Sequence, residues 1–327
     1  MNRSTRAVVT VILLVIPGAA ALAQRTGQGF PDRPLRYIVP FPPGGSTDIV
    51  ARIVAAGLAE SLGQQVVIDN RGGAGGTLGA EIAAHATADG YTLFACNIGS
   101  LAVSPALYKK LGYDPVAGFA PIGLIGSTAN ALVVHLGVPA KTIAQFIALA
   151  KASPGKINYA SPGVGSSPQL SMEMFWTAAG INFIHVPYKG AGPALVELMG
   201  GHVEAMVSTV PSFLGAARAG KIHMLGVTST TRHPDLPDVP TFAESGMPGF
   251  EVISWQGLCT PAGVPGAELG RIRGALARVL ALPQTQKHLA VQGMQPKELT
   301  AEKFAVFIRT ERDKYAKVVK DAGIKPQ

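Results

Sequence analysis

Segments with strand character and segments with helix character alternate in two runs along this chain, and this alternation limits the fold more than any other feature. The first run covers 35–95 and the second covers 142–228. Alternating β and α segments are typical of parallel α/β sheets. Between the runs, the apolar stretch FAPIGLIGSTANALVVHL (119–136) lacks helix signals and could be a strand that leaves one sheet and enters another. The pattern predicts an α/β protein with two lobes.

The same pattern gives the expected boundaries. Strands are expected at 35–41, 65–69, 91–95, 157–160, 182–187, 203–208 and 222–228. Helices are expected at 46–62, 77–86, 142–152, 168–179, 192–199, 212–219, 265–281 and 301–321. A proline-rich loop at 233–249 precedes FEVISWQGLCTP (250–261), the expected return crossing. We therefore expect one lobe to comprise 24–128 and 252–327, and the other lobe to comprise 129–251.

The first residues have the pattern of a secretory signal peptide. MNRSTR is a basic segment, AVVTVILLVIPGAAAL is apolar, and ALA before Gln24 is a small-x-small cleavage site. A membrane anchor is the alternative, but Pro17 and Gly18 interrupt an apolar run that is shorter than the ~20 residues needed to span a bilayer. The sequence predicts cleavage after Ala23 and export across the inner membrane.

Charge and cysteine content exclude some classes of function. The formal charge is +8, and loss of Arg3 and Arg6 with the signal peptide leaves +6. The basic residues are interleaved with acidic ones near the C-terminus, which is typical of a solvated helix face, so no nucleic-acid partner is expected. Only Cys96 and Cys259 are present, and they could form one disulfide or be two separately buried thiols.

Two junctions share one chemical pattern, in which a strand is followed by proline and glycine, then by hydroxyl residues at the start of a helix. They are PFPPGGSTDIV (40–50) and INYASPGVGSSPQLSMEMF (157–175). Glycine allows close approach of a ligand, and the first N–H groups of a helix have no acceptor within it and favour an anion. Helix capping alone is the ordinary alternative for each junction. Two such junctions in facing lobes favour one shared cleft, because ligands of open α/β sheets bind beyond the carboxyl ends of the strands.

The loops CNIGS (96–100) and STVPS (208–212) also follow predicted strands. Asn97, Ser208 and Thr209 could orient a polar ligand there, although turn and cap chemistry explains them equally well. Dinucleotide, P-loop, zinc-protease and nucleophile-elbow motifs are all missing, and the seven histidines lack metal-ligand spacing. No cofactor and no metal are therefore expected, although a catalytic triad assembled in space stays open.

Several motifs together resemble the Bug-type extracytoplasmic solute receptors, which are the substrate-binding proteins of tripartite tricarboxylate transporters. They cover nearly the whole mature chain and include PDRPLRYIVPFPPGGSTDIVAR, NRGGAGG, DGYTLF, YASPGVGSSPQL, HVPYKGAGPAL, LPDVPTFAESGMPGFE and VVKDAGIKP. The resemblance implies a type II periplasmic-binding-protein fold, in which two α/β lobes joined by two crossing strands close a cleft over a small carboxylate. It also implies a periplasmic location.

The resemblance further implies which residues bind the ligand. From the first junction these are Phe41, Gly44, Gly45, Ser46 and Thr47; from the second, Gly165, Ser166 and Ser167; and from the strand-end loops, Asn97 and Ser208. Asp48 would repel an anionic ligand, so a capping or helix-dipole role is expected for it.

The implied partners are a small carboxylate and the subunits of a membrane permease. A sensor-kinase ectodomain is a possible further partner, and the receptor is expected to be a monomer. Receptors of this type often carry an acidic residue where this chain has Ser208 and Thr209 in AMVSTVPS (205–212). An acid without an amino group is therefore expected, such as a di- or tricarboxylate, an aromatic acid or a hydroxy acid. The alternative class is a secreted α/β hydrolase that acts on such an acid.

Overall fold

The computed structural model describes residues 29–164 and 166–321. The chain divides into two units, Met1–Phe30 and Pro31–Gln327, and the fold given below is that of the second unit. The predicted signal peptide, residues 1–23, lies outside the described residues. Within the described part, no helix is both long enough and apolar enough to cross a bilayer.

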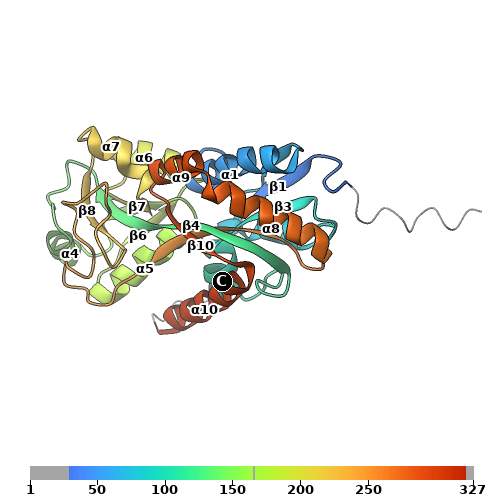
Figure 1. Cartoon of the computed structure of the whole chain (residues 1–327). Helices are drawn as coiled ribbons and strands as arrows, with labels where there is room; N and C mark the ends of the chain where they lie inside the picture. The colour runs from blue at the N-terminus through green and yellow to red at the C-terminus, as the bar shows by residue number, and fades with distance from the viewer. Residues whose placement is uncertain (1–28, 165, 322–327) are drawn as a thin grey trace, which may run out of the picture. The chain divides into compact units, whose positions relative to one another are not determined.

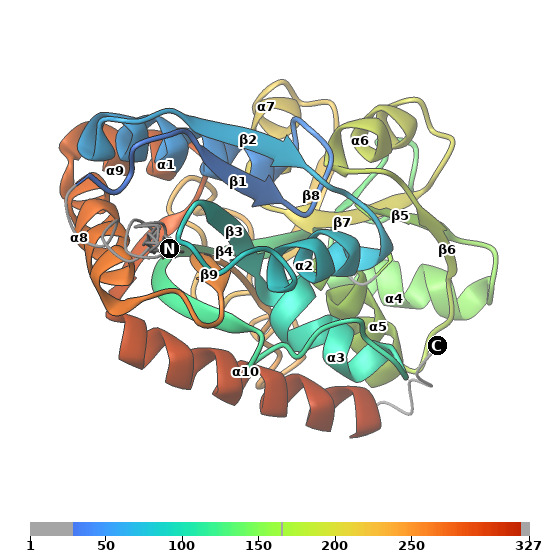
Figure 2. The same ribbon diagram turned by 90° about the vertical axis from the view of Figure 1, so that its right-hand side faces the viewer.

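The first half of the sheet has a parallel core with antiparallel neighbours (Figures 1 and 2). The strand β1 pairs in parallel with β2 and β3, whereas β3 and β4 both pair antiparallel with β9. A further strand, β10, pairs antiparallel with β4. The bounds are β1 Leu35–Val39, β2 Val66–Asn70, β3 Thr92–Asn97, β4 Phe119–Val134, β9 Ile253–Pro261 and β10 Gln295–Leu299.

The second half of the sheet has the same plan. The strand β5 pairs in parallel with β6 and β7, and both β7 and β8 pair antiparallel with β4. The bounds are β5 Asn158–Ser161, β6 Ile184–Pro187, β7 Ala205–Thr209 and β8 His223–Val227. This arrangement confirms the mixed α/β class and the two lobes that the sequence predicts.

The long strand β4 belongs to both halves. Its residues 119–129 pair with β9, and its residues 130–134 pair with β7 and β8. The prediction that 119–136 leaves one sheet and enters another is therefore confirmed. The chain returns just before β9, where the N–H of Val252 donates to the carbonyl of Thr228 at 3.0 Å.

Helices cover both halves of the sheet. The helix α1 packs against α8 and β2, α10 packs against β4, and α5, α6 and α7 all contact β7. The bounds are α1 Ser46–Leu62, α2 Thr77–Ala84, α3 Ser104–Leu107, α4 Ile143–Ala152, α5 Ser167–Ala179, α6 Ala191–Met199, α7 Pro211–Arg218, α8 Gly266–Ala281, α9 Pro283–Val291 and α10 Ala301–Asp321. Short 3-10 and π turns occupy Ala74–Gly76 and Gly99–Val103.

The predicted boundaries need a few corrections. The first strand ends at Val39, not at 41, because Pro40 has no N–H to continue the ladder. The predicted helix 77–86 ends at Ala84, since His85 already leaves the helical conformation. The helices α3 and α9 and the strand β10 were not predicted. The helix α3 has only four residues, and PQTQKHLAV of α9 and QPKEL of β10 carry too few apolar residues to show helix or strand periodicity.

Close packing joins β9 to α10 in the core of the first lobe. The ring of Trp255 meets the rings of Phe304 and Phe307 edge-on, with centroids 5.8 and 5.5 Å away. A Cβ at Gly257 would lie 2.3 Å from the Phe304 ring. Only glycine therefore allows α10 to lie this close to the strand.

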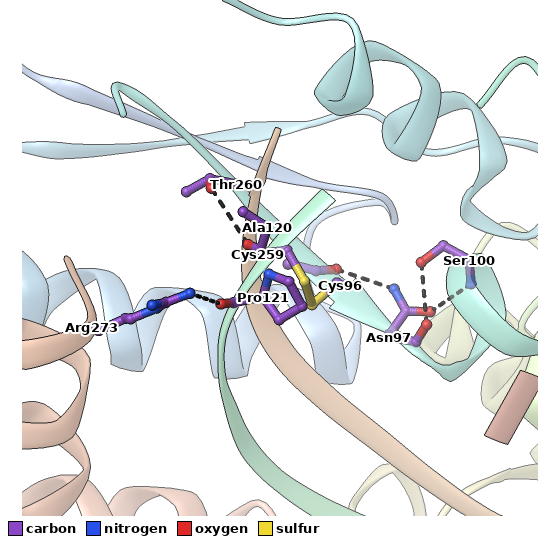
Figure 3. Close-up of a disulfide and its surroundings, with 9 residues drawn as sticks. Cys96, Asn97, Ser100, Ala120, Pro121, Cys259, Thr260 and Arg273 are labelled. Carbon is purple, nitrogen blue, oxygen red and sulfur yellow. Dashed lines mark hydrogen bonds between the residues drawn. A yellow bond between two sulfur atoms is a disulfide. The ribbon is translucent and has the colours of Figure 1, made fainter. Parts of the chain in front are cut away.

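Cys96 of β3 and Cys259 of β9 form a disulfide (Figure 3). Both residues are fully buried, and their Cα atoms are 5.9 Å apart. Of the two alternatives that the sequence left open, the structure has the bridge. It links segments 163 residues apart, so it constrains the unfolded chain strongly.

Removing this bridge should destabilise the protein. We expect Cys96→Ala to lower the free energy of unfolding in urea by about 2–5 kcal/mol, because the unfolded chain regains the entropy that the bridge removes. The double variant with Cys259→Ala should lose little more, since either substitution alone breaks the bond. If the two single losses instead add up in the double variant, the cysteines act independently and are not bridged.

Candidate functional site

A cavity, called the main cavity here, lies where the parallel strands of both lobes end. Its walls come from the segments that follow β1, β3, β5, β6 and β7, and from β9. The lining residues are Phe41, Pro42, Gly45, Ser46, Thr47, Asn97, Ile98, Gly99, Pro162, Ser166, Ser167, Pro168, Gly190, Ala191, Ser208, Thr209, Ser212, Ser254 and Gln256. This position, beyond the carboxyl ends of parallel strands, is the usual ligand site of an open α/β sheet.

The helices α1, α5, α6 and α7 begin at the main cavity. The first or second residue of each helix lines it: Ser46, Ser167, Ala191 and Ser212. The first N–H groups of a helix lack acceptors within it, and the peptide dipoles add partial positive charge at this end. The main cavity therefore presents donors and positive potential from both lobes.

None of the described residues that line the main cavity is charged. Its polar groups are hydroxyls, the amides of Asn97 and Gln256, and the backbone. An anion would meet no like charge in these walls, and a buried cation would find no counter-charge in them. The lining therefore favours an anion or a neutral ligand.

A larger cavity, the rear cavity, lies on the opposite face of β9. Successive side chains of a strand point to opposite faces, so Ser254 and Gln256 line the main cavity while Ile253 and Trp255 line the rear cavity. The rear cavity contains the carboxyl groups of Glu251 and Glu311. Lys314 also lines it, but its ammonium group lies 3.8 and 3.7 Å from these two carboxylates and is paired with them, so the rear cavity is a poorer anion site than the main cavity.

The structure brings together most of the predicted site residues. The main cavity is lined by Phe41, Gly45, Ser46, Thr47, Asn97, Ser166, Ser167 and Ser208. Gly44 instead lines an adjoining chamber. Gly165 lies outside the described residues.

Local hydrogen bonds give some of these residues a second role. Ser166 caps α5, since its Oγ accepts from the N–H of Gln169 at 3.4 Å and donates to the carbonyl of Gly163 at 2.7 Å. The amide of Asn97 donates to the carbonyl of Ala95 at 3.2 Å and accepts from the N–H of Ser100 at 3.1 Å. Capping and turn formation, the alternatives considered from the sequence, thus coexist with a place in the cavity wall.

Several wall residues of the main cavity were not predicted from the sequence. Gln256 donates to Ser46 Oγ at 3.2 Å, so it joins β9 to the start of α1. The alternation of polar Ser254 and Gln256 with apolar neighbours was the available signal. Gly190 and Ala191 were missed as well, although YKGAG repeats the junction of strand, glycine and helix start.

Asp48 stabilises the first junction without lining the main cavity. Its carboxylate accepts from Gly44 N, Arg52 Nε and Asn70 Nδ2, each at 2.9 Å, and the residue is 2% exposed. Burial would raise the pKa of Asp48, but the hydrogen bonds from Arg52, Gly44 and Asn70 outweigh it and hold the pKa below its ordinary value of 3.8. The expectation of a local structural role agrees with these contacts.

Ser161 and His185 support the second junction. Ser161 Oγ lies 2.7 Å from His185 Nε2 and accepts from the N–H of Gly163 at 3.2 Å. Burial lowers the pKa of His185 to about 4, so the imidazole is neutral near pH 7. The carbonyl of Pro162 accepts from the N–H of Gly190 at 2.9 Å, which ties together two loops that line the main cavity.

The stability supplied by Asp48 should depend on pH. Its pKa is lower in the folded protein, so the unfolded chain takes up the proton first as the pH falls below about 4. We expect Asp48→Asn to lower the free energy of unfolding by about 1–3 kcal/mol at pH 7. This loss in the free energy of unfolding should become smaller as the pH falls from about 4 towards 3. Urea unfolding of wild type and variant at each pH measures it.

The matched control is Asp313→Asn, because the Asp313 side chain is 67% exposed and pairs with Arg312 on the surface. It should change stability by no more than about 0.5 kcal/mol at any pH. A loss for Asp48→Asn that stays constant from pH 7 to pH 3 would contradict the role of the ionised carboxylate.

Comparison with known proteins identifies the family. A family model described as tripartite tricarboxylate transporter family receptor matches residues 50–324. Protein BugT of Bordetella pertussis is 35% identical over 96% of this chain and 97% of its own length. A protein from the tcbD-tcbE intergenic region of a Pseudomonas strain is 36% identical over 97% of this chain and 94% of its own.

Two solved structures from Rhodopseudomonas palustris have the same fold. Rpa4515 with adipate is 35% identical, with a TM-score of 0.87 over 91% of this chain and all of its own. MatC with bound malate is 33% identical, with a TM-score of 0.85 over 89% of this chain and all of its own. The chain therefore belongs to the family of tripartite tricarboxylate transporter receptors, which confirms the resemblance drawn from its motifs.

Proposed function

We propose that this protein is a periplasmic receptor that captures a small carboxylate in the main cavity and delivers it to a tripartite tricarboxylate-type permease. The observation that carries the proposal is an uncharged cavity at which α1, α5, α6 and α7 all begin. Each helix start stabilises an anion by about 0.3–1 kcal/mol, and by up to ~2 kcal/mol where partly buried. Hydrogen bonds to a charged group add about 1.5–3 kcal/mol each.

The relatives support a carboxylate ligand. Rpa4515 is described with adipate and MatC with malate, and both ligands are small dicarboxylates. Their chains align with this one over nearly their whole length. We extend this ligand class, but not either compound, to the main cavity.

An acid without an amino group suits the walls best. Ser208 and Ser212 lie 3.2 Å apart through their hydroxyl oxygens, and Thr209 Oγ1 is also 3.2 Å from Ser212 Oγ. No carboxylate lines the described walls to pair with an ammonium group, and that of Asp48 is occupied by Gly44, Arg52 and Asn70. Burying an unpaired ammonium group there would be costly.

We further propose that the protein is not an enzyme. Ser161 and His185 have the separation of a nucleophile and its base. However, Ser161 is fully buried, does not line the main cavity, and uses its hydroxyl to hold Gly163. These contacts support a structural role for the pair, against the alternative of a secreted hydrolase.

The proposed partners follow from the family. Permease subunits would receive the liganded protein, and a sensor-kinase ectodomain could contact the same liganded form. We propose a monomer for the free receptor. The two lobes proposed, 24–128 with 252–327 and 129–251, would close about β4 and the return segment before β9, since β4 alone runs through both half-sheets of the described fold.

Small carboxylates should stabilise the protein. At a concentration 100 times the dissociation constant, a ligand adds about 2.7 kcal/mol. For a chain of this size that is a rise in melting temperature of roughly 4 °C. We expect such a rise with mono- or dicarboxylates, and none with sugars or nucleotides, in a panel of thermal melts.

Two controls sharpen this test. Calorimetry should show that succinate binds more tightly than aspartate. The substitution Ser208→Asp should lower the affinity for succinate at least tenfold and raise the affinity for aspartate relative to that for succinate. Mass spectrometry after incubation with stoichiometric protein should recover the acid unchanged. A shift only with sugars, or conversion of the acid to a product, would refute the proposed function.

Ligand that bridges the lobes should close them. A ligand favours the closed state only through the extra contacts it makes there. Small-angle scattering should therefore give a smaller radius of gyration with saturating ligand than without it. An unchanged radius would show that both forms are already closed or that the ligand touches one lobe only.

A further inference from the structure

Beside the main cavity lies a second space, called the side chamber here. Ser46, Ala191 and Ser212 line both spaces, so the side chamber adjoins the main cavity at these residues. Its own walls include Ile49 of α1, Gly192 of α6 and Gln292, which follows α9. A ligand held in the main cavity could therefore extend into it.

The side chamber has a distinct chemistry. No described residue that lines it is charged, Ile49 offers apolar surface, and Gln292 is its longest polar side chain. The carboxamide of Gln292 can donate to an oxygen, as can the hydroxyls of Ser46 and Ser212 at the boundary. These walls suit methylene groups that end in an oxygen-bearing group, and they offer no partner for an ammonium group.

We propose that the side chamber receives the distal end of the ligand and that the preferred ligands are elongated acids. Their second oxygen-bearing group stands several carbons from the first carboxylate. This inference rests on the proposed function, in which the main cavity holds the first carboxylate. Gln292 is then a residue that sets ligand length rather than one that binds every acid.

Gly192 offers a way to fill the side chamber without straining the fold. A Cβ at this position would meet no heavy atom within 4 Å, and the residue is the second of helix α6. Gly192→Phe therefore adds volume at the chamber wall. Gly270 of α8 is a matched control, because it is also helical and exposed, and also has no heavy atom within 4 Å of a Cβ.

The test is calorimetry of wild type, Gly192→Phe and Gly270→Phe with two dicarboxylates, succinate and the longer suberate. We expect wild type and Gly270→Phe to bind suberate about tenfold more tightly than succinate. Gly192→Phe should lower the affinity for suberate by about tenfold and change the affinity for succinate by less than about twofold.

A second variant tests the distal contact and does not depend on the bulky substitution. Gln292→Ala should lower the affinity for suberate by about fivefold or more. It should leave the affinity for octanoate, which lacks the distal carboxylate, within about twofold of wild type. If succinate binds but suberate is unaffected by both variants, or if wild type prefers succinate, the side chamber proposal is wrong and the proposed function stands. If neither dicarboxylate binds, the side chamber proposal is wrong, and the proposed function is then decided by the thermal melts with the wider panel of carboxylates.

Discussion

The pairing of β4 with both half-sheets is the constraint on which the rest of the structure depends. Its residues 119–129 form a ladder with β9, and its residues 130–134 form ladders with β7 and β8. A strand buried on both faces must keep one register, since a slip by one residue turns every side chain to the other face. The shared strand therefore sets where the carboxyl ends of β1, β3, β5 and β7 stand, and these ends form the main cavity.

The main cavity uses backbone and hydroxyl groups where many anion sites use arginine. This choice keeps the walls neutral, so the empty site carries no buried charge that lacks a partner. The ionisable side chains lie behind the cavity wall. Asp48 holds the first junction through Gly44 and Asn70, and neutral His185 holds the second through Ser161. Under the proposed function, selectivity against amines would follow from the absence of a carboxylate in the described walls, and affinity would follow from donors that folding has already positioned.

Features that depend on the local sequence pattern could be predicted from the sequence. Strand and helix periodicity located most elements, and the junctions at 40–50 and 157–175 marked walls that do meet at one cavity. The sequence could not predict contacts that depend on register between distant strands. Gln256 reaches Ser46 only because β9 pairs with β3 and β4. The residues around Gln256 indicate a strand with one polar face, but they do not indicate which strands it pairs with. The pairing of Cys96 with Cys259 was open for the same reason.

The positions of the disulfide and of the main cavity depend on the same strand register. In the ladder between β3 and β9, Cys96 stands opposite Gly257, and Asn97 stands opposite Gln256. The bridge to Cys259 therefore lies next to the pair of amides in the cavity wall. If β9 slipped by one residue, Gln256 would point into the rear cavity and Trp255 into the main cavity, which would remove the contact to Ser46 and fill the site with an indole ring. A covalent link at this position thus stabilises the fold and keeps the main cavity open and polar.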